Sequence, residues 1–204
     1  MTSDLTRNLL IILITAVLTE NFVLSQFLGV CPFLGVSKKV SSSLGMGVMI
    51  TFVMVCASIL TFPIYFLILV PLEIEFLNNI AFILIIALFV QLTEMVLKKY
   101  LPSLNKSLGI YLPLMTCNCA ILGVTMLNIT GEYIFIEAVF NALFAGLGFL
   151  LVLLIFSGVR ARIEKCDVPL ALRGMPVTLI TAAIVSLSFI GFAGMVEGIF
   201  GVLS

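Results

Sequence analysis

The chain has 204 residues, of which 62% are hydrophobic, and its mean hydropathy is +1.33. Its ten basic and ten acidic residues give a formal net charge of zero. Soluble domains are typically about 45–50% apolar, so this composition excludes a soluble enzyme and predicts an integral membrane protein. The absence of histidine excludes haem and catalytic zinc sites built on imidazole within the chain. The chain also lacks a basic run of the kind that binds nucleic acid.

Six apolar segments are long enough to cross a bilayer, since a hydrocarbon core of about 30 Å needs roughly 20 helical residues. The connections between them are short, so we expect one all-α membrane domain over residues 1–204. We expect the first segment to be retained, because it is too long for a signal-peptide core and lacks a convincing cleavage site. In chain order the expected spans are residues 8–30, 44–70, 76–97, 108–129, 133–157 and 175–201.

The basic residues indicate how the spans are oriented. Nine of the ten Lys and Arg residues follow the first, third or fifth expected span. Because positively charged loops stay in the cytoplasm, we expect a multi-pass protein of the bacterial cytoplasmic membrane whose two termini both face outward. The nine residues are Lys38, Lys39, Lys98, Lys99, Lys106, Arg160, Arg162, Lys165 and Arg173.

Three spans in each half predict an inverted repeat, with residues 1–107 as the first unit and residues 108–204 as the second. An odd number of spans turns the second unit upside down, and proteins of this kind place their functional site near the midplane, on interrupted helices. We therefore expect spans one and four to be interrupted. The helix-breaking residues there are Gly29, Pro32 and Gly35 in span one, and Pro113 and Gly123 in span four.

A six-residue pattern that begins with cysteine occurs in both halves, as CPFLGV from Cys31 and CAILGV from Cys119, 88 positions apart. Two thiols at matching positions favour a symmetric ligand site, because thiolates prefer soft metals and iron–sulfur clusters. Cys117 is a less favoured ligand, because it lies two residues before Cys119 and therefore on the other face of a helix. We interpret Cys56 as a packing residue and Cys166 as a reduced loop thiol.

Three polar residues within the apolar spans are candidates for an ion path. Glu20 lies near the centre of span one beside Asn21, and an ionisable residue at that depth indicates function. A hydrogen bond that fixes helix packing explains Glu20 equally well. Asn118 precedes Cys119 and could hydrogen-bond a cluster sulfide or line a cation path.

Pairs of glycines occur in the second and fifth spans, at Gly45 and Gly47 and at Gly146 and Gly148. Small residues in membrane helices let two backbones approach closely. We interpret both pairs as helix-packing positions and not as sites of chemistry.

Three stretches resemble a known membrane-protein family: TENFVL at 19–24, FLGVCPFLGVS at 27–37 and YLPLMTCNCAILGV at 111–124. They are similar to the signatures of the Rnf and Nqr membrane subunits, and the similarity runs over essentially the full length. Within this family the chain most resembles the A type of the Rnf complex, an ion-translocating ferredoxin:NAD oxidoreductase. Cys117 stands where the family pattern has threonine, so it remains an alternative to Cys119 as a ligand.

The resemblance implies a subunit that shares one [2Fe–2S] cluster with the E type of the Rnf complex, a partner of similar fold and opposite orientation. Cys31 and Cys119 match the ligand positions on this side, and the other two of the four thiolates that such a cluster needs would come from the partner. The remaining partners would be the B, C, D and G types of the same complex and membrane lipid. The assembled complex would couple electron transfer to Na+ or H+ translocation, with no complete active site in this chain.

Two other hypotheses remain open on the residues alone. A secondary transporter would show the same inverted repeats and broken helices without any metal. A structural scaffold for a larger membrane complex would use the thiols only for packing. The visible spectrum of the purified protein with its partners separates these hypotheses, because an iron–sulfur cluster gives a brown colour.

Overall fold

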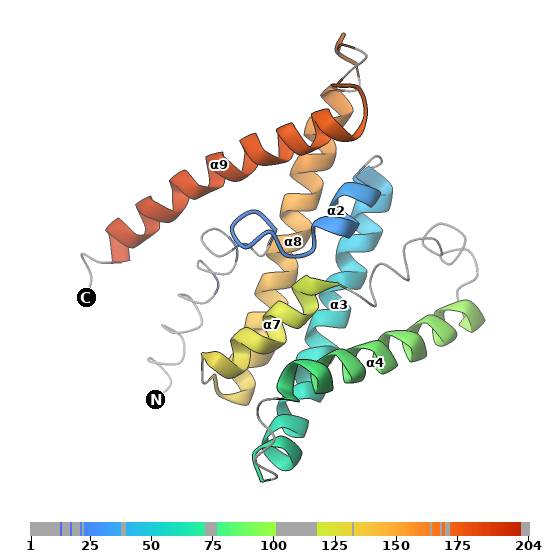
Figure 1. Ribbon diagram of the computed structural model, residues 1–204, viewed down its shortest axis with the longest axis vertical. Coiled ribbons are helices and arrows are strands. Elements are labelled where there is room, and N and C mark those ends of the chain that lie inside the picture. The colour runs from blue at the N-terminus through green and yellow to red at the C-terminus, as the bar shows by residue number, and fades with distance from the viewer. Residues whose placement is uncertain are drawn as a thin grey trace.

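The structure is a computed structural model that describes residues 13, 17, 21, 23–37, 40–71, 77–100, 118–131, 133–163, 165–167, 169 and 172–200. Its regular elements over these residues are all helices (Figure 1). Two long helices form the centre, α3 (Val40–Ile64) and α8 (Phe135–Ile163), and they pack against each other. A π-helical turn, η2 (Tyr65–Leu69), continues α3 after Pro63, whose missing N–H disturbs the α-helical pattern.

Glycines bring α3 and α8 close together. A Cβ atom added to Gly146 would lie 2.6 Å from Cγ2 and 2.8 Å from Cα of Thr51. A Cβ atom added to Gly47 would lie 2.5 Å from Cδ1 of Leu150. Neither position has room for a larger side chain, so the predicted packing role of these two glycines is confirmed.

The remaining helices surround this pair. α7 (Cys119–Thr130) contacts both central helices, and α4 (Asn78–Tyr100) contacts α3 and α7. α9 (Met175–Phe200) packs against α8, and the short helix α2 (Val30–Val36) lies against α3 (Figure 1). Many large apolar side chains on the outer faces are exposed, which suits a surface that faces lipid.

Among the described residues, three helices are long and apolar enough to cross a membrane: Val40–Leu67, Asn78–Val96 and Phe135–Ile163. They correspond to the expected spans 44–70, 76–97 and 133–157, and the last continues six residues beyond its expected end. Shorter apolar helices occupy Cys119–Thr130 and Met175–Gly191. The six-span inverted repeat itself stays a prediction, because residues 101–117 and most of the first 20 lie outside the described part.

The backbone leaves the helical conformation where span one was expected to break. Residues 23–29 form turns, Gly29 has a left-handed φ of 80°, and α2 begins only at Val30. The expected span 8–30 is therefore not one continuous helix. In the fourth expected span, Asn118 is extended, with φ −77° and ψ 110°, and α7 begins at Cys119.

Substitution of Gly146 by Ala tests the close approach of α3 and α8. The added methyl group would overlap the backbone of Thr51, and overpacking of this kind costs about 1–3 kcal/mol. We therefore expect Gly146→Ala to lower the unfolding midpoint of the purified protein in detergent.

Gly158→Ala on the same helix is the matched control, because a Cβ atom there meets nothing within 4 Å. Its stability should be unchanged or raised by about 0.5–1 kcal/mol, since Ala is the better helix former. Equal midpoints for the two variants would contradict the packing described above.

Candidate functional site

The two cysteines of the repeated motif both lie in the first turn of a helix. Cys31 lies in the first turn of α2, and Cys119 is the first residue of α7. Both thiols are free, and both residues are exposed. They are therefore available to a ligand or a neighbouring chain at the surface of this protein.

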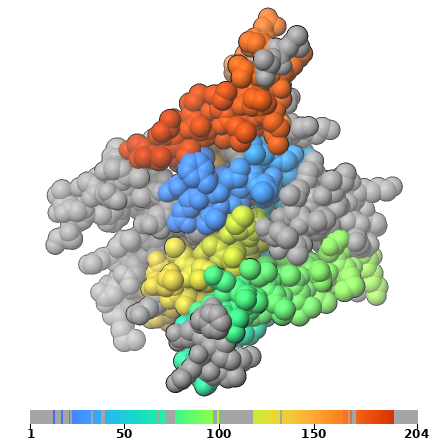
Figure 2. All heavy atoms as spheres, in the orientation of Figure 1, coloured from blue at the N-terminus to red at the C-terminus, as the bar shows by residue number. Residues whose placement is uncertain are grey.

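Gly29 brings the two motif turns into contact. A Cβ atom on Gly29 would lie 3.0 Å from Cβ of Ala120 and 3.1 Å from Oδ1 of Asn118, the two residues that flank Cys119. Gly29 itself lies two positions before Cys31, so turns about 90 residues apart in the chain meet here. Figure 2 shows the two segments, 23–36 in blue and 118–131 in yellow, side by side on one face.

The side chain of Asn118 has two polar atoms, and only its oxygen is hydrogen-bonded to a described residue. Its Oδ1 accepts a hydrogen bond of 3.0 Å from the backbone N–H of Ala120 and so caps the start of α7. Its Nδ2 is buried and has no hydrogen-bond partner within the part of the chain that the structure describes. A buried donor without a partner costs about 1–3 kcal/mol, so this amide nitrogen is an unused hydrogen-bond donor directly beside Cys119.

Asn21 is engaged in holding the broken segment in place. Its Nδ2 donates to the carbonyl of Gly148 on α8 at 3.0 Å, and its Oδ1 accepts from the N–H of Val23 at 3.2 Å. Ser186 on α9 donates to the carbonyl of Leu24 at 2.5 Å. These bonds fix the turn that precedes Cys31 against two helices of the second half.

Arg160 holds the other end of α2. Its Nη1 donates to the carbonyl of Leu34 at 2.9 Å and to Oγ of Ser37 at 2.7 Å. The side chain is buried near the end of α8, and its positive charge lies at the C-terminal end of α2, where it satisfies the carbonyl of Leu34. The sequence predicts Arg160 only as a cytoplasmic charge, because a basic residue after an apolar span is the ordinary positive-inside pattern.

A second polar cluster joins three helices at the far end of α7. Asn128 donates to Oγ of Ser58 at 2.9 Å and to the carbonyl of Ala138 at 3.2 Å, and Asn141 donates to Oδ1 of Asn128 at 2.8 Å. These residues come from α7, α3 and α8, so the cluster locks α7 onto the central pair. Sequence reasoning also missed this cluster, for which the signal was a buried amide within each of two apolar spans.

The other predicted residues take simpler positions. Cys56 is half-buried in α3, and Cys166 is exposed, with its Sγ donating to the carbonyl of Arg162 at 3.5 Å. Glu20 and Cys117 lie outside the described residues. The described part thus brings together the turns of Cys31 and Cys119 with Asn118, and it uses Asn21 as a support.

The two exposed thiols can supply only part of the ligand set of a metal site. Two thiolates would be half of the four that a [2Fe–2S] cluster needs, and Nδ2 of Asn118, which no described residue pairs, is a donor beside one of them. The residues present therefore fit half of a shared cluster cage.

Comparisons with known proteins show the family to which the chain is similar. A family model described as Rnf-Nqr subunit, membrane protein, matches residues 9–196. The A-type subunit of the Na(+)-translocating ferredoxin:NAD(+) oxidoreductase complex of Acetobacterium woodii is 54% identical over 93% of this chain and 99% of that protein. The A-type subunit of the ion-translocating oxidoreductase complex of Syntrophotalea carbinolica is 53% identical over 94% of this chain and all of that protein. Its counterpart of the same name in Aliivibrio salmonicida is 51% identical over 92% of this chain and 97% of that protein.

Substitution of Gly29 by Ala tests the contact between the two motif turns. The new methyl group would press on Ala120 and Asn118 and would also strain the left-handed backbone, so we expect a loss of about 2–4 kcal/mol in the free energy of unfolding.

Gly174→Ala separates backbone strain from packing, because Gly174 also has a positive φ, of 99°, but a Cβ atom there meets nothing within 4 Å. It should cost only about 1–2 kcal/mol. If denaturation in detergent gives the same loss for both variants, the two turns do not press on each other as described.

Proposed function

The chain belongs to the Rnf-Nqr family of membrane subunits, and from this premise we propose that it is the A-type subunit of an ion-translocating complex that transfers electrons from ferredoxin to NAD+. The match over nearly the full length of both chains supports this, since the relatives carry no extra domain that this chain lacks. The protein would contribute to electron transfer and would not contain a complete active site.

Cys31 and Cys119 would each supply one thiolate to a [2Fe–2S] cluster. The observation that carries this proposal is the contact of Gly29 with Asn118 and Ala120, which unites two turns that each present an exposed cysteine. A bound cluster would supply one-electron transfer within the membrane. Cys117, outside the described residues, stays the alternative to Cys119.

A partner of the same fold would complete the ligand set. Four thiolates are needed, and this chain presents two from matching motifs, so the E-type subunit of the Rnf complex is the economical source of the others. Exposure of both cysteines suits a site that closes only where two subunits meet. The B, C, D and G types would be the further members of the complex.

The surrounding residues would position the ligands and keep water away. Asn21, Ser186 and Arg160 anchor the turn and helix that carry Cys31. Beneath the two turns lies a buried apolar layer that includes Phe149 and Ile121. Nδ2 of Asn118 would donate a hydrogen bond to a sulfur atom at the site.

We extend the proposal to six spans in two inverted halves, with the basic loops in the cytoplasm and the termini outside. The transported ion would be Na+ or H+, and the name of the relative from Acetobacterium woodii favours Na+. Glu20, Asn21 and Asn118 are the candidate ion path, with Asn21 acting mainly through its bonds to α8. A secondary transporter without metal is the weaker alternative, because the relatives are named as members of oxidoreductase complexes.

Replacement of either cysteine tests the ligand assignment. Cys31→Ser or Cys119→Ser should each remove most of the iron and the EPR signal from the purified pair of subunits, because serine does not replace thiolate as a soft ligand. Cys166→Ser, which removes an exposed thiol elsewhere, is the matched control and should keep its iron. A normal iron content in both motif variants would defeat the assignment.

Asn118→Asp tests the proposed hydrogen bond to sulfur. Aspartate keeps the oxygen that caps α7 but replaces the Nδ2 donor by a negative oxygen, so we expect a lower reduction potential in a redox titration of the EPR signal. Asn118→Ser also retains a capping oxygen without adding charge, and it should lower the potential less. An unchanged potential in both variants would show that the amide does not reach the cluster.

A further inference from the structure

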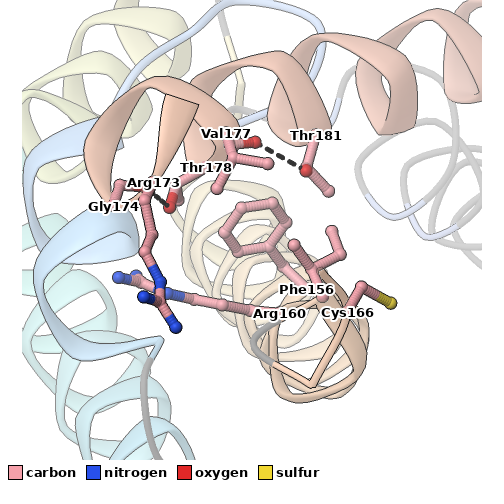
Figure 3. A pocket seen from close by; sticks show the side chains of 9 residues that line it. Phe156, Arg160, Cys166, Arg173, Gly174, Val177, Thr178 and Thr181 are labelled. Carbon is pink, nitrogen blue, oxygen red and sulfur yellow. Dashed lines mark hydrogen bonds between the residues drawn. The ribbon is translucent and has the colours of Figure 1, made fainter. Parts of the chain in front are cut away.

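A cavity of about 290 Å³ lies between the end of α8 and the start of α9. Its walls include Phe156, Arg160 and Ile163 from α8 and Val177 and Thr178 from α9, with Arg173 just before α9 (Figure 3). The volume is at the low end of the range for small-molecule sites, about 300–1,000 Å³. It suits a headgroup or a small anion better than a large cofactor.

Two arginines give this cavity a positive charge. Figure 3 shows the guanidinium groups of Arg160 and Arg173 extending toward the same end of the cavity, while the thiol of Cys166 points away. None of the described lining residues is a carboxylate. Two like charges that share a small cavity repel each other. An anion bound between them would be attracted to both and would offset this repulsion.

The arginines are also the right side chains for a phosphate. Arg160 is only 8% exposed and is held in place by its bonds to Leu34 and Ser37, so its charge stays at a defined position. A guanidinium group carries five N–H donors in a planar fork that matches phosphate oxygens. Arg173 is exposed and can turn toward a ligand that enters from outside.

The apolar part of the lining distinguishes a lipid from a free ion. Phe156, Ile163 and Val177 offer no polar contact, and they belong to two apolar helices. The cavity sits where these helices meet their basic connection, which is the level of the headgroups at the cytoplasmic surface in the orientation proposed above. Basic pockets between membrane helices at this surface suit anionic phospholipids.

We propose that this cavity binds the phosphate of an anionic phospholipid, with Arg160 and Arg173 on its oxygens and the partly exposed Ile163 and Val177 against the glycerol and upper acyl chain. The proposal uses the cytoplasmic orientation of the basic loops but does not depend on the iron–sulfur site. Because Arg160 also holds the end of α2, the lipid would stabilise the support of Cys31 from the opposite side.

The test compares two charge-neutralising variants of the purified complex. Arg173→Gln removes a lining arginine, whereas Lys165→Gln removes an exposed basic residue of the same connection that does not line the cavity. Native mass spectrometry during a titration with phosphatidylglycerol measures the bound lipid. We expect about fivefold weaker binding for Arg173→Gln, unchanged binding for Lys165→Gln, and unchanged iron in both.

Three outcomes would overturn the proposal. Equal weakening in both variants would mean that only the overall surface charge attracts the lipid. Displacement of the lipid by inorganic phosphate at an equal phosphate concentration would identify a free-anion site. Loss of a protein partner from Arg173→Gln with its lipid content unchanged would mean that an acidic protein segment fills the cavity.

Discussion

Backbone N–H and C=O groups inside a bilayer find no water, so a break in a membrane helix has to be hydrogen-bonded by the protein itself. The turn before Cys31 meets this requirement with side chains from distant helices. Asn21 accepts from the N–H of Val23, and Ser186 donates to the carbonyl of Leu24. Arg160 then satisfies the carbonyl of Leu34 at the end of α2. These bonds tie the broken segment and α2 to α8 and α9.

This requirement also explains how the polar side chains are distributed. The described amides and hydroxyls near the motif turns are largely engaged in holding backbone, and Nδ2 of Asn118 is the exception. The cysteines themselves are left at the surface. The turn and helix that carry Cys31 are thus held by distant helices while both thiols stay exposed, and this is the arrangement on which the proposal of a shared cluster rests.

Hydropathy predicts the helices well where nothing interrupts their apolar character. The expected spans 44–70 and 76–97 agree within a few residues with α3 plus η2, and with α4. The expected fifth span ends at 157, whereas α8 continues to Ile163. The apolar pattern stops where the charged residues begin, but the helix continues through Arg160, whose side chain is buried against the end of α2. The repeated cysteine motif marks the two turns that lie in contact. Gly29, a predicted helix breaker, lies directly before the start of α2. The polar cluster of Asn128, Ser58 and Asn141 could not be predicted, since the choice of partners depends on how three helices pack.

The fit of Gly47 against Leu150 and of Gly146 against Thr51 joins helices from opposite halves of the chain. Ribosomes deliver α3 to the bilayer well before α8 exists, so the small-residue face of α3 must first pack against lipid. Insertion and core formation are therefore separate events in the biosynthesis of this protein. The turn before Cys31 comes last, because Ser186 belongs to the final helix to be made.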